Sequence, residues 1–212
     1  MTARSDAGAP APVTRRPQQE RGRLTRQRVL EAAVDSLAEH GWRGSSVTVI
    51  AKRAGVSRGA AQHFFPTREA LFAAAIEHVT DIRLDEIRKG AADLPRGRGR
   101  TAAVIDMLST LYTGPLFKAA LQLWAAGSTE PEMRPHVLLL EAHLGRQAHR
   151  AAVDLLDIDE NIPGARETIQ GLLDMARGLG LADVIADDTA RRRRIILQWA
   201  DIIDNERARL KS

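Results

Sequence analysis

One stretch of the chain decides the fold: residues 50–65, which read IAKRAGVSRGAAQHFF. Its first part continues a helical pattern over residues 47–54, for which Ser46 is the expected N-cap. A tight turn at Gly55 follows, and Ser57 is positioned to cap a second short helix that ends with the stretch. Two short helices joined by a turn that contains glycine form a helix-turn-helix candidate.

The second of these helices has two chemically different faces. Ala61, Phe64 and Phe65 share one face at helical spacing, so they can pack onto the preceding helices. The outward face consists of Arg58, Gly59, Gln62 and His63. Small residues let a backbone approach the major groove closely, arginine pairs bidentately with guanine, and glutamine pairs with adenine. The sequence therefore predicts a recognition helix for double-stranded DNA.

The same region resembles the signature of the TetR family of bacterial transcriptional regulators, T-x-x-x-I-A-x-x-A-G-V-S-x-G-x-x-Y-x-x-F-x-x-K-x-x-L. The resemblance covers about residues 24–80, and the matching positions are Ile50, Ala51, Ala54, Gly55, Val56, Ser57, Gly59, Phe65 and Leu71. Ser46 and Arg68 replace the Thr and Lys of the signature, and Gln62 stands where the family usually has Tyr. That last departure indicates a divergent operator preference with the same mode of binding.

The resemblance implies an all-α protein in which an N-terminal helix-turn-helix domain precedes a larger helical domain for ligand binding and dimerisation. By position it implies DNA contacts from Ser46, Thr48, Ser57, Arg58, Gly59, Ala60, Gln62, His63 and Arg68. We expect Arg58 and Gln62 to read bases. Ser46, Ser57, His63 and Arg68 are expected to position the DNA backbone, because free N–H groups at helix N-termini attract phosphate.

Helical spacing continues along the rest of the chain. Apolar residues recur at this spacing from Leu24 until a stop at Gly41, and a long helix is predicted from Pro66-Thr67 to about Lys89. Residues 90–100, rich in glycine and arginine, predict a loop. Further helices are expected at about 101–113, 115–127, 131–157, 164–185 and 188–210, with Thr129 and Glu132 as a capping box before the third of them and Pro131 in its first turn. No strand pattern is present, so the predicted class is all-α.

Charge is divided unevenly along the chain. Residues 1–66 carry 11 Lys and Arg against 5 Asp and Glu, whereas residues 67–212 carry 20 against 22. The basic character therefore belongs to the first third, as expected of a polyanion-binding module on a nearly neutral body. We expect a disordered basic arm over 1–22, a helix-turn-helix DNA-binding domain over 23–66, and a regulatory, ligand-binding and dimerisation domain over 67–212.

A small-molecule pocket is a further implication of the resemblance. Mostly apolar side chains with a few polar groups are typical of such pockets. The candidates are Met107, Leu111, Tyr112, Phe117, Leu121, Trp124, Leu138, His143 and Met175. A mostly apolar effector, such as a lipid, a steroid-like or an aromatic compound, fits this set.

The resemblance also implies a homodimer in which the last two helices pair with their symmetry mates. The apolar stripes on these helices that we assign to the interface are Ile169, Leu172, Leu173, Ala176, Ile195, Ile196, Trp199, Ile202 and Ile203. A dimer suits a single helix-turn-helix, because two recognition helices about 34 to 36 Å apart read a palindromic site.

Other chemistry has little support in the sequence. Residues 55–59 match G-x-S-x-G, but the nucleophile elbow of a hydrolase needs a preceding strand, so no enzyme is predicted. Neither His136 nor His143 belongs to a HExxH or comparable pair, cysteine is absent, and we expect neither a metal nor a cofactor. No apolar run approaches the length of a membrane span and no signal peptide is evident, which predicts a cytoplasmic protein.

Together these patterns predict a sequence-specific DNA-binding transcriptional regulator. The preferred form is a repressor released from a palindromic operator by a small, mostly apolar effector. A ligand-independent repressor, an activator and a non-enzymatic all-helical adaptor protein remain as alternatives.

Overall fold

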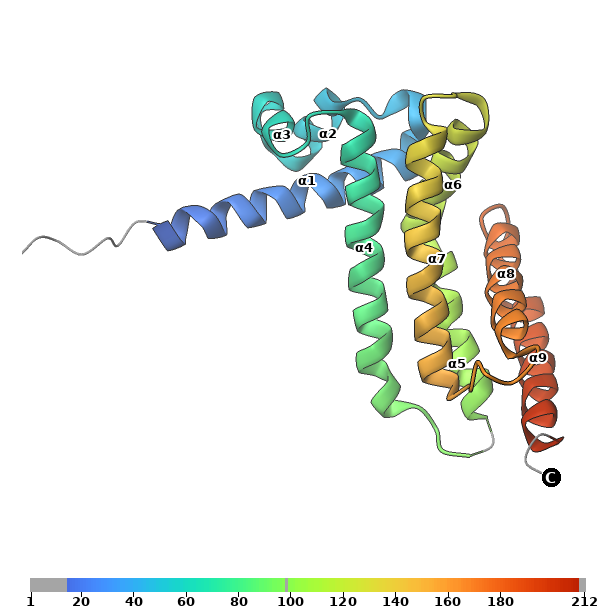
Figure 1. Ribbon diagram of the computed structural model, residues 1–212. Coiled ribbons are helices and arrows are strands. Elements are labelled where there is room, and N and C mark those ends of the chain that lie inside the picture. The colour runs from blue at the N-terminus through green and yellow to red at the C-terminus, as the bar shows by residue number, and fades with distance from the viewer. Residues whose placement is uncertain (1–14, 98, 210–212) are drawn as a thin grey trace, which may run out of the picture.

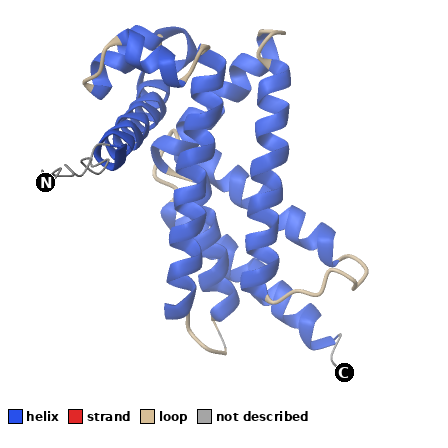
Figure 2. Ribbon diagram, turned by 60° about the vertical axis from the view of Figure 1, so that its left-hand side comes forward, coloured by secondary structure: helices blue, strands red, loops and turns tan. Residues whose placement is uncertain are grey.

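The computed structural model describes residues 15–97 and 99–209, and helices with short connecting turns make up these ranges (Figures 1 and 2). No strand occurs in these two ranges, which confirms the predicted all-α class. The helices are α1 (Arg15–Gly44), α2 (Val47–Ala54), α3 (Arg58–Phe64), α4 (Arg68–Gly90), α5 (Arg100–Ser109), α6 (Gly114–Thr129), α7 (Arg134–Leu156), α8 (Ala165–Asp183) and α9 (Thr189–Arg209). Two short 3-10 turns, η1 (Ala91–Asp93) and η2 (Thr110–Tyr112), follow α4 and α5.

The boundaries of the helix-turn-helix are set by local capping, as the sequence predicts. Ser46, Ser57 and Thr67 each accept a hydrogen bond from the backbone N–H three residues further on, at the starts of α2, α3 and α4. Gly55 ends α2 in the left-handed conformation, with φ 67°, which favours glycine. These caps satisfy backbone groups that a short helix would otherwise expose, so both short helices are defined by their own sequence.

Helix α1 is longer than predicted at both ends. Residues 15–22, expected in a disordered arm, are helical, and residues 1–14 lie outside the described part of the chain. Gly41, the predicted stop, has φ 67° and ψ −179° and breaks the helix, after which a last turn runs to Gly44. A Cβ on Gly41 would lie 2.9 Å from the side-chain oxygen of Gln122 on α6, so α1 changes direction where α6 lies against it.

The predicted start of the helix after α6 is wrong. Thr129 is the last residue of α6, and its hydroxyl donates back to carbonyl groups within that helix, so it caps nothing downstream. Helix α7 begins at Arg134, which leaves Glu132 and Pro131 in the connecting turn. Pro135, rather than Pro131, occupies the first turn of α7.

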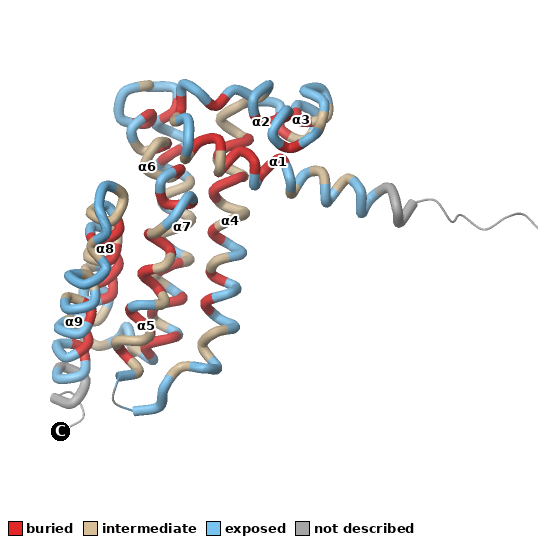
Figure 3. Tube along the Cα trace, turned by 180° about the vertical axis from the view of Figure 1, so that it is seen from behind, coloured by how far each residue is buried: buried red, intermediate tan, exposed pale blue. Residues whose placement is uncertain are grey.

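The buried side chains form two clusters. Figure 3 marks the buried residues in red along the backbone. The first cluster joins α1–α3, which we call the head, to the first half of α4, to α6 and to the start of α7. The second cluster joins the rest of α4 to α5, α7, α8 and α9. Leu71 and Phe72, just inside α4, are fully buried in the first cluster, so the core does not divide at the expected boundary after Pro66.

Helix α4 therefore spans the molecule from the head to the far end of the body, which we define as α4–α9, with α7 beside it (Figure 1). The first turns of α1 project away from the body (Figure 1). None of the described helices combines the length and the apolar character needed to cross a bilayer.

Candidate nucleic-acid interface and effector pocket

The recognition helix α3 lies on the head with one face packed and the other free. Ala61 is fully buried and Phe65 is 5% exposed, both within the first cluster, while Phe64 is half-buried beside it. The four predicted outward residues, Arg58, Gly59, Gln62 and His63, are all exposed. The two-faced arrangement predicted from the sequence is confirmed.

An ion-pair cluster fixes α2 against α1. The guanidinium of Arg53 donates to both carboxylate oxygens of Glu39 at 2.6 and 2.7 Å, and one nitrogen also reaches Asp35 at 3.5 Å. The hydrogen bond from Arg53 holds the pKa of Glu39 below its ordinary value. A bidentate pair of this kind has a defined geometry, so it fixes the angle at which the turn presents α3. The sequence shows Arg53 as one basic residue of the motif but carries no signal for its partners.

Eight of the nine predicted DNA contacts remain accessible. Thr48 and the caps Ser46 and Ser57 are exposed near the starts of α2 and α3, and Ala60 is half-buried. Together with the four outward residues of α3 they place hydroxyl, amide, imidazole and guanidinium groups on two neighbouring helices. Such groups contact phosphates and base edges in protein–DNA complexes, and these individual contacts stay predictions.

Arg68, the ninth residue, is partly withdrawn into the head. Its guanidinium carbon lies 3.7 Å from the centre of the Trp42 ring, and its Nε donates to the carbonyl of Ser45 at 3.0 Å. Burial lowers the pKa of Arg68. This residue therefore holds the start of α4 against the end of α1, and its phosphate contact stays a prediction.

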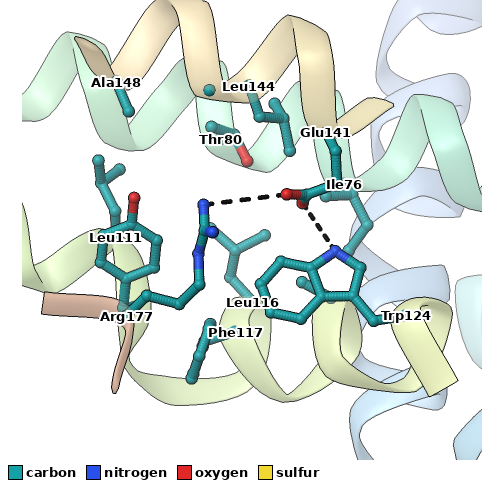
Figure 4. A pocket seen from close by; sticks show the side chains of 13 residues that line it. Ile76, Thr80, Leu111, Leu116, Phe117, Trp124, Glu141, Leu144, Ala148 and Arg177 are labelled. Atoms are coloured by element: carbon teal, nitrogen blue, oxygen red, sulfur yellow. Dashed lines mark hydrogen bonds and ion pairs between the residues drawn. The ribbon is translucent and has the colours of Figure 1, made fainter. Parts of the chain in front are cut away.

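A cavity of about 50 Å³ lies inside the body, between α4, η2, α6, α7 and α8 (Figure 4). Its lining is Ile76, Thr80, Leu111, Tyr112, Leu116, Phe117, Ala120, Trp124, Glu141, Leu144, Gly145, Ala148 and Arg177. Four of the nine predicted pocket residues belong to it: Leu111, Tyr112, Phe117 and Trp124.

The other five predicted residues do not line this cavity. Met107, Leu121 and Met175 are partly buried in the second cluster, around it rather than in its wall. Leu138 is a correction, because it is 63% exposed near the start of α7, where the body has no helix to cover it. His143 is a second correction: its Nε2 lies 3.1 Å from a carboxylate oxygen of Glu77, at half-exposed positions outside the lining.

One wall of the cavity carries charged and hydrogen-bonded groups, which the sequence did not predict. The guanidinium carbon of Arg177 lies 5.1 Å from the ring centre of Trp124 and 5.5 Å from that of Tyr112. Glu141 accepts a hydrogen bond from Trp124 Nε1 at 2.7 Å, and its other oxygen lies 3.8 Å from Arg177 (Figure 4). Burial raises the pKa of Tyr112, so this phenol stays protonated at neutral pH. In the sequence Arg177 and Glu141 look like solvent-exposed charged residues of a helix. The packing of α7 against α8 brings the two side chains together.

A wider polar groove of about 590 Å³ adjoins the cavity between α7 and α8. The groove shares Tyr112, Glu141, Gly145 and Arg177 with the cavity and adds charged residues, among them Glu160, Arg166 and Asp174. The side chain of Arg177 therefore separates a small, mostly apolar space from a larger, hydrated one.

Most of the predicted dimer-interface residues lie inside the chain's own core. Six of them are buried in the second cluster: Ile169, Leu172, Leu173, Ala176, Ile196 and Ile203. A side chain already buried in its own chain has almost no area left to bury against a partner, so these six are corrected to core positions. Ile195 and Trp199 are half-buried, and Ile202 is 44% exposed. The exposed large apolar residues near this end of the chain are Leu181, Ile185, Leu197 and Ile202.

The recognition helix is exposed, its start is capped by Ser57, and it is joined to an all-helical body that contains a small pocket. These features define a helix-turn-helix regulator that binds DNA. The profile of the family described as "Bacterial regulatory proteins, tetR family" matches residues 29–75. The HTH-type transcriptional regulator Mb2936c of Mycobacterium bovis is 30% identical over 137 residues, which cover 65% of this chain and 70% of that protein. The chain belongs to the TetR family of bacterial regulatory proteins.

Two further comparisons cover most of the chain. The HTH-type transcriptional regulator BetI of Burkholderia mallei is 27% identical over 186 residues, 85% of this chain and 92% of that protein. The crystal structure of a transcriptional regulator from Pseudomonas aeruginosa PAO1 superposes with a TM-score of 0.67 at 25% identity, covering 91% of this chain and 93% of that one. The similarity therefore extends through the body as well as the head, and this protein is a DNA-binding transcriptional regulator.

Proposed function

We propose that this regulator is a repressor that binds a palindromic operator as a homodimer and leaves it when a small, mostly apolar effector enters the body. One observation carries the proposal. The cavity is walled on one side by Ile76 and Thr80 of α4, and the first turn of the same helix, at Leu71 and Phe72, is buried in the head. A ligand that displaces α4 at the cavity thus acts on the helix that directly follows α3.

The expected mechanism is a shift between two conformations. The cavity of about 50 Å³ has room for little more than water, so an effector must move its walls apart. Movement of α4 alters the separation of two recognition helices, which must stay about 34 to 36 Å apart to enter successive major grooves. The coupling equals the difference in the effector's affinity for the two conformations, typically about 1–3 kcal/mol.

At the operator, Arg58 and Gln62 read base edges from the exposed face of α3. The remaining predicted contacts, Ser46, Thr48, Ser57, Gly59, Ala60 and His63, allow close approach to the DNA or position its backbone. Arg68 contributes from the start of α4 only through the part of its guanidinium that Trp42 and Ser45 leave free.

The homodimer forms through the outer faces of α8 and α9. These faces are exposed in the protomer (Figure 3) and include Leu181, Leu197 and Ile202. Ile185, just after α8, is 90% exposed, and exposed apolar residues that lie together on a protein surface mark interaction sites. The protein acts in the cytoplasm, where its DNA is, and catalyses no reaction.

Operator mapping tests this function most directly. Purified protein is footprinted on the DNA upstream of its own gene, and the isolated site is then titrated by gel shift across a range of salt. We expect a palindromic footprint, affinity that falls steeply with salt, and release by at least one compound from a thermal-shift screen of small apolar molecules. The absence of sequence-selective binding would support the adaptor alternative and overturn the proposal.

The same preparation separates the remaining alternatives. Operator binding that no stabilising compound reverses would indicate a ligand-independent repressor. A reporter gene whose expression falls when the regulator is deleted would indicate an activator.

A further inference from the structure

We propose that the effector of this protein is an organic cation with an apolar substituent, and that the guanidinium of Arg177 occupies the cation's place while the site is empty. The inference rests on the proposed function, since it assigns a ligand class to the same pocket.

The side chains around Arg177 form a site for a positive charge. The rings of Trp124 and Tyr112 lie 5.1 and 5.5 Å from the guanidinium carbon, within the range of cation–π attraction. Phe117 stands edge-on to both, with ring centres 5.8 Å from Tyr112 and 6.2 Å from Trp124. Two rings that face the guanidinium, supported by a third on the same cavity, form an aromatic cage of the kind by which proteins recognise organic cations.

Glu141 gives the cage a negative charge. Its carboxylate is held by the indole N–H of Trp124 at 2.7 Å and faces the guanidinium at 3.8 Å. A carboxylate and the faces of two aromatic rings attract a cation and repel an anion. An anionic ligand bound to Arg177 would have to lie beside Glu141, which argues against that alternative.

Arg177 is incompletely hydrogen-bonded in this cage. Its closest carboxylate contact is to Asp174 on its own helix, at 3.3 Å, and its Nε is buried without a hydrogen-bond partner among the described residues. A buried donor without an acceptor costs free energy, which lowers the cost of moving the side chain out. The rings and Glu141 thus face a positive charge, while one N–H of that guanidinium lacks an acceptor.

The adjoining groove provides room for Arg177 to leave. The groove is lined by Arg177 itself and by Asp174, which already contacts the guanidinium at 3.3 Å and can remain its partner as the side chain turns outward. An incoming cation would bind in the cage as Arg177 turns outward. Its apolar substituent would lie against Leu111, Leu116 and Leu144 in the cavity. Because Arg177 belongs to α8, this exchange also moves the wall that faces α4.

The test compares three probes of similar size and different charge. They are phenylguanidinium, which is cationic, phenylurea, which is neutral and nearly isosteric, and phenylacetate, which is anionic. Binding to the full chain is measured by isothermal titration calorimetry. We expect phenylguanidinium to bind the wild-type protein at least about tenfold more tightly than phenylurea, and phenylacetate to bind more weakly than either.

Two substitutions sharpen the comparison. Arg177→Met removes the competing charge and keeps an unbranched side chain, so phenylguanidinium should bind about tenfold more tightly still, with phenylurea unchanged. Glu141→Gln keeps an acceptor for Trp124 and removes the negative charge, so it should weaken phenylguanidinium binding about tenfold. The matched control is Arg166→Met, at an exposed arginine of the groove that lies outside the cage lining. This substitution should leave the affinities for phenylguanidinium and phenylurea unchanged.

Several results would overturn the inference. Tighter binding of phenylacetate, abolished in Arg177→Met, would make Arg177 an anchor for anions. Equal binding of phenylguanidinium and phenylurea, or binding of no probe at all, would also exclude a cation site. If either variant unfolds, the wild-type comparison of the three probes decides alone. Operator binding and its release by screened compounds are measured separately, so failure here is distinguishable from failure of the repressor function.

Discussion

The indole N–H of Trp42 donates to a carboxylate oxygen of Glu130 at 2.7 Å and so joins the end of α1 to the turn between α6 and α7. The guanidinium carbon of Arg68 lies 3.7 Å from the centre of the same indole ring. The ring also packs against Phe72, with 5.4 Å between ring centres. One side chain of the head thus contacts the start of α4 and the top of the body together. This contact adds a hydrogen bond to the apolar packing that joins head and body in the first buried cluster.

Replacement of Glu130 by Ala should destabilise the protein by about 1–3 kcal/mol, because a partly buried indole N–H loses its acceptor. The free energy of unfolding in urea is the appropriate measurement. The matched control is Glu132→Ala, an exposed residue of the same turn, which should change stability by less than about 0.5 kcal/mol. Equal effects of the two substitutions would show that the Trp42 contact contributes nothing measurable.

Substitution of Arg68 by Lys should separate packing from charge at the start of α4. Lysine keeps a positive charge for phosphate but lacks the planar group that stacks on Trp42 and bonds to Ser45. We expect a loss of about 1–2 kcal/mol in unfolding free energy, while operator affinity at matched salt is retained. A stable variant with weakened affinity would instead favour direct phosphate binding as the main role of Arg68.

Removal of the Arg58 side chain by substitution with Ala should relax preference at one operator position. A bidentate contact to guanine discriminates by about 1–3 kcal/mol, so the variant should bind the cognate base pair and its replacements with nearly equal affinity there. Competition gel shifts on single-base operator variants measure this. Lys52→Ala, at an exposed position of α2 outside the predicted contacts, serves as control and should preserve the full preference.

Gly180 on α8 packs directly against the backbone of Tyr112. A Cβ there would overlap the Tyr112 carbonyl oxygen, which is backbone and cannot turn aside. Gly180→Ala should therefore cost at least about 1–3 kcal/mol and raise the sensitivity to urea. Gly145→Ala, in the middle of α7 with no atom near the added carbon, should be neutral or stabilise by about 0.5–1 kcal/mol. A tolerated Gly180→Ala would mean that α8 can move away from η2 at little cost.

The proposed dimer surface predicts which apolar residues matter for assembly. Leu197→Glu and Ile202→Glu should dissociate the homodimer, since a charge there would be desolvated in the interface. Sedimentation velocity gives the oligomeric state, and operator affinity should fall with it. Leu139→Glu, at a more exposed apolar position on α7, should leave the dimer intact. A dimer that survives both interface substitutions would exclude the outer faces of α8 and α9.

The predictable parts of this fold are those that depend on neighbours in the sequence. The caps at Ser46 and Ser57 and the buried positions Ala61 and Phe65 follow from spacing within a few residues. The helical start of α1 was not predicted, because residues 15–22 lack apolar periodicity and include Pro17 and Gly22, which are poor helix formers.

Features that depend on packing between distant helices were missed or misplaced. Leu111, Tyr112, Phe117 and Trp124, chosen for their apolar character, line the cavity, and their contact with an effector stays a prediction. Arg177, at the centre of the same pocket, is indistinguishable in the sequence from a solvated helix residue. The stripes of α8 and α9 showed which residues are buried, and periodicity cannot tell burial in the chain's own core from burial against a second chain.

The shared buried cluster of the head, α4, α6 and α7 has a consequence for heat sensitivity. Because α3 has no core of its own, it cannot melt while the body stays folded, and the loss of both should follow one cooperative transition. Operator binding in the absence of effector should then be lost over the same temperature range as the fold of the body.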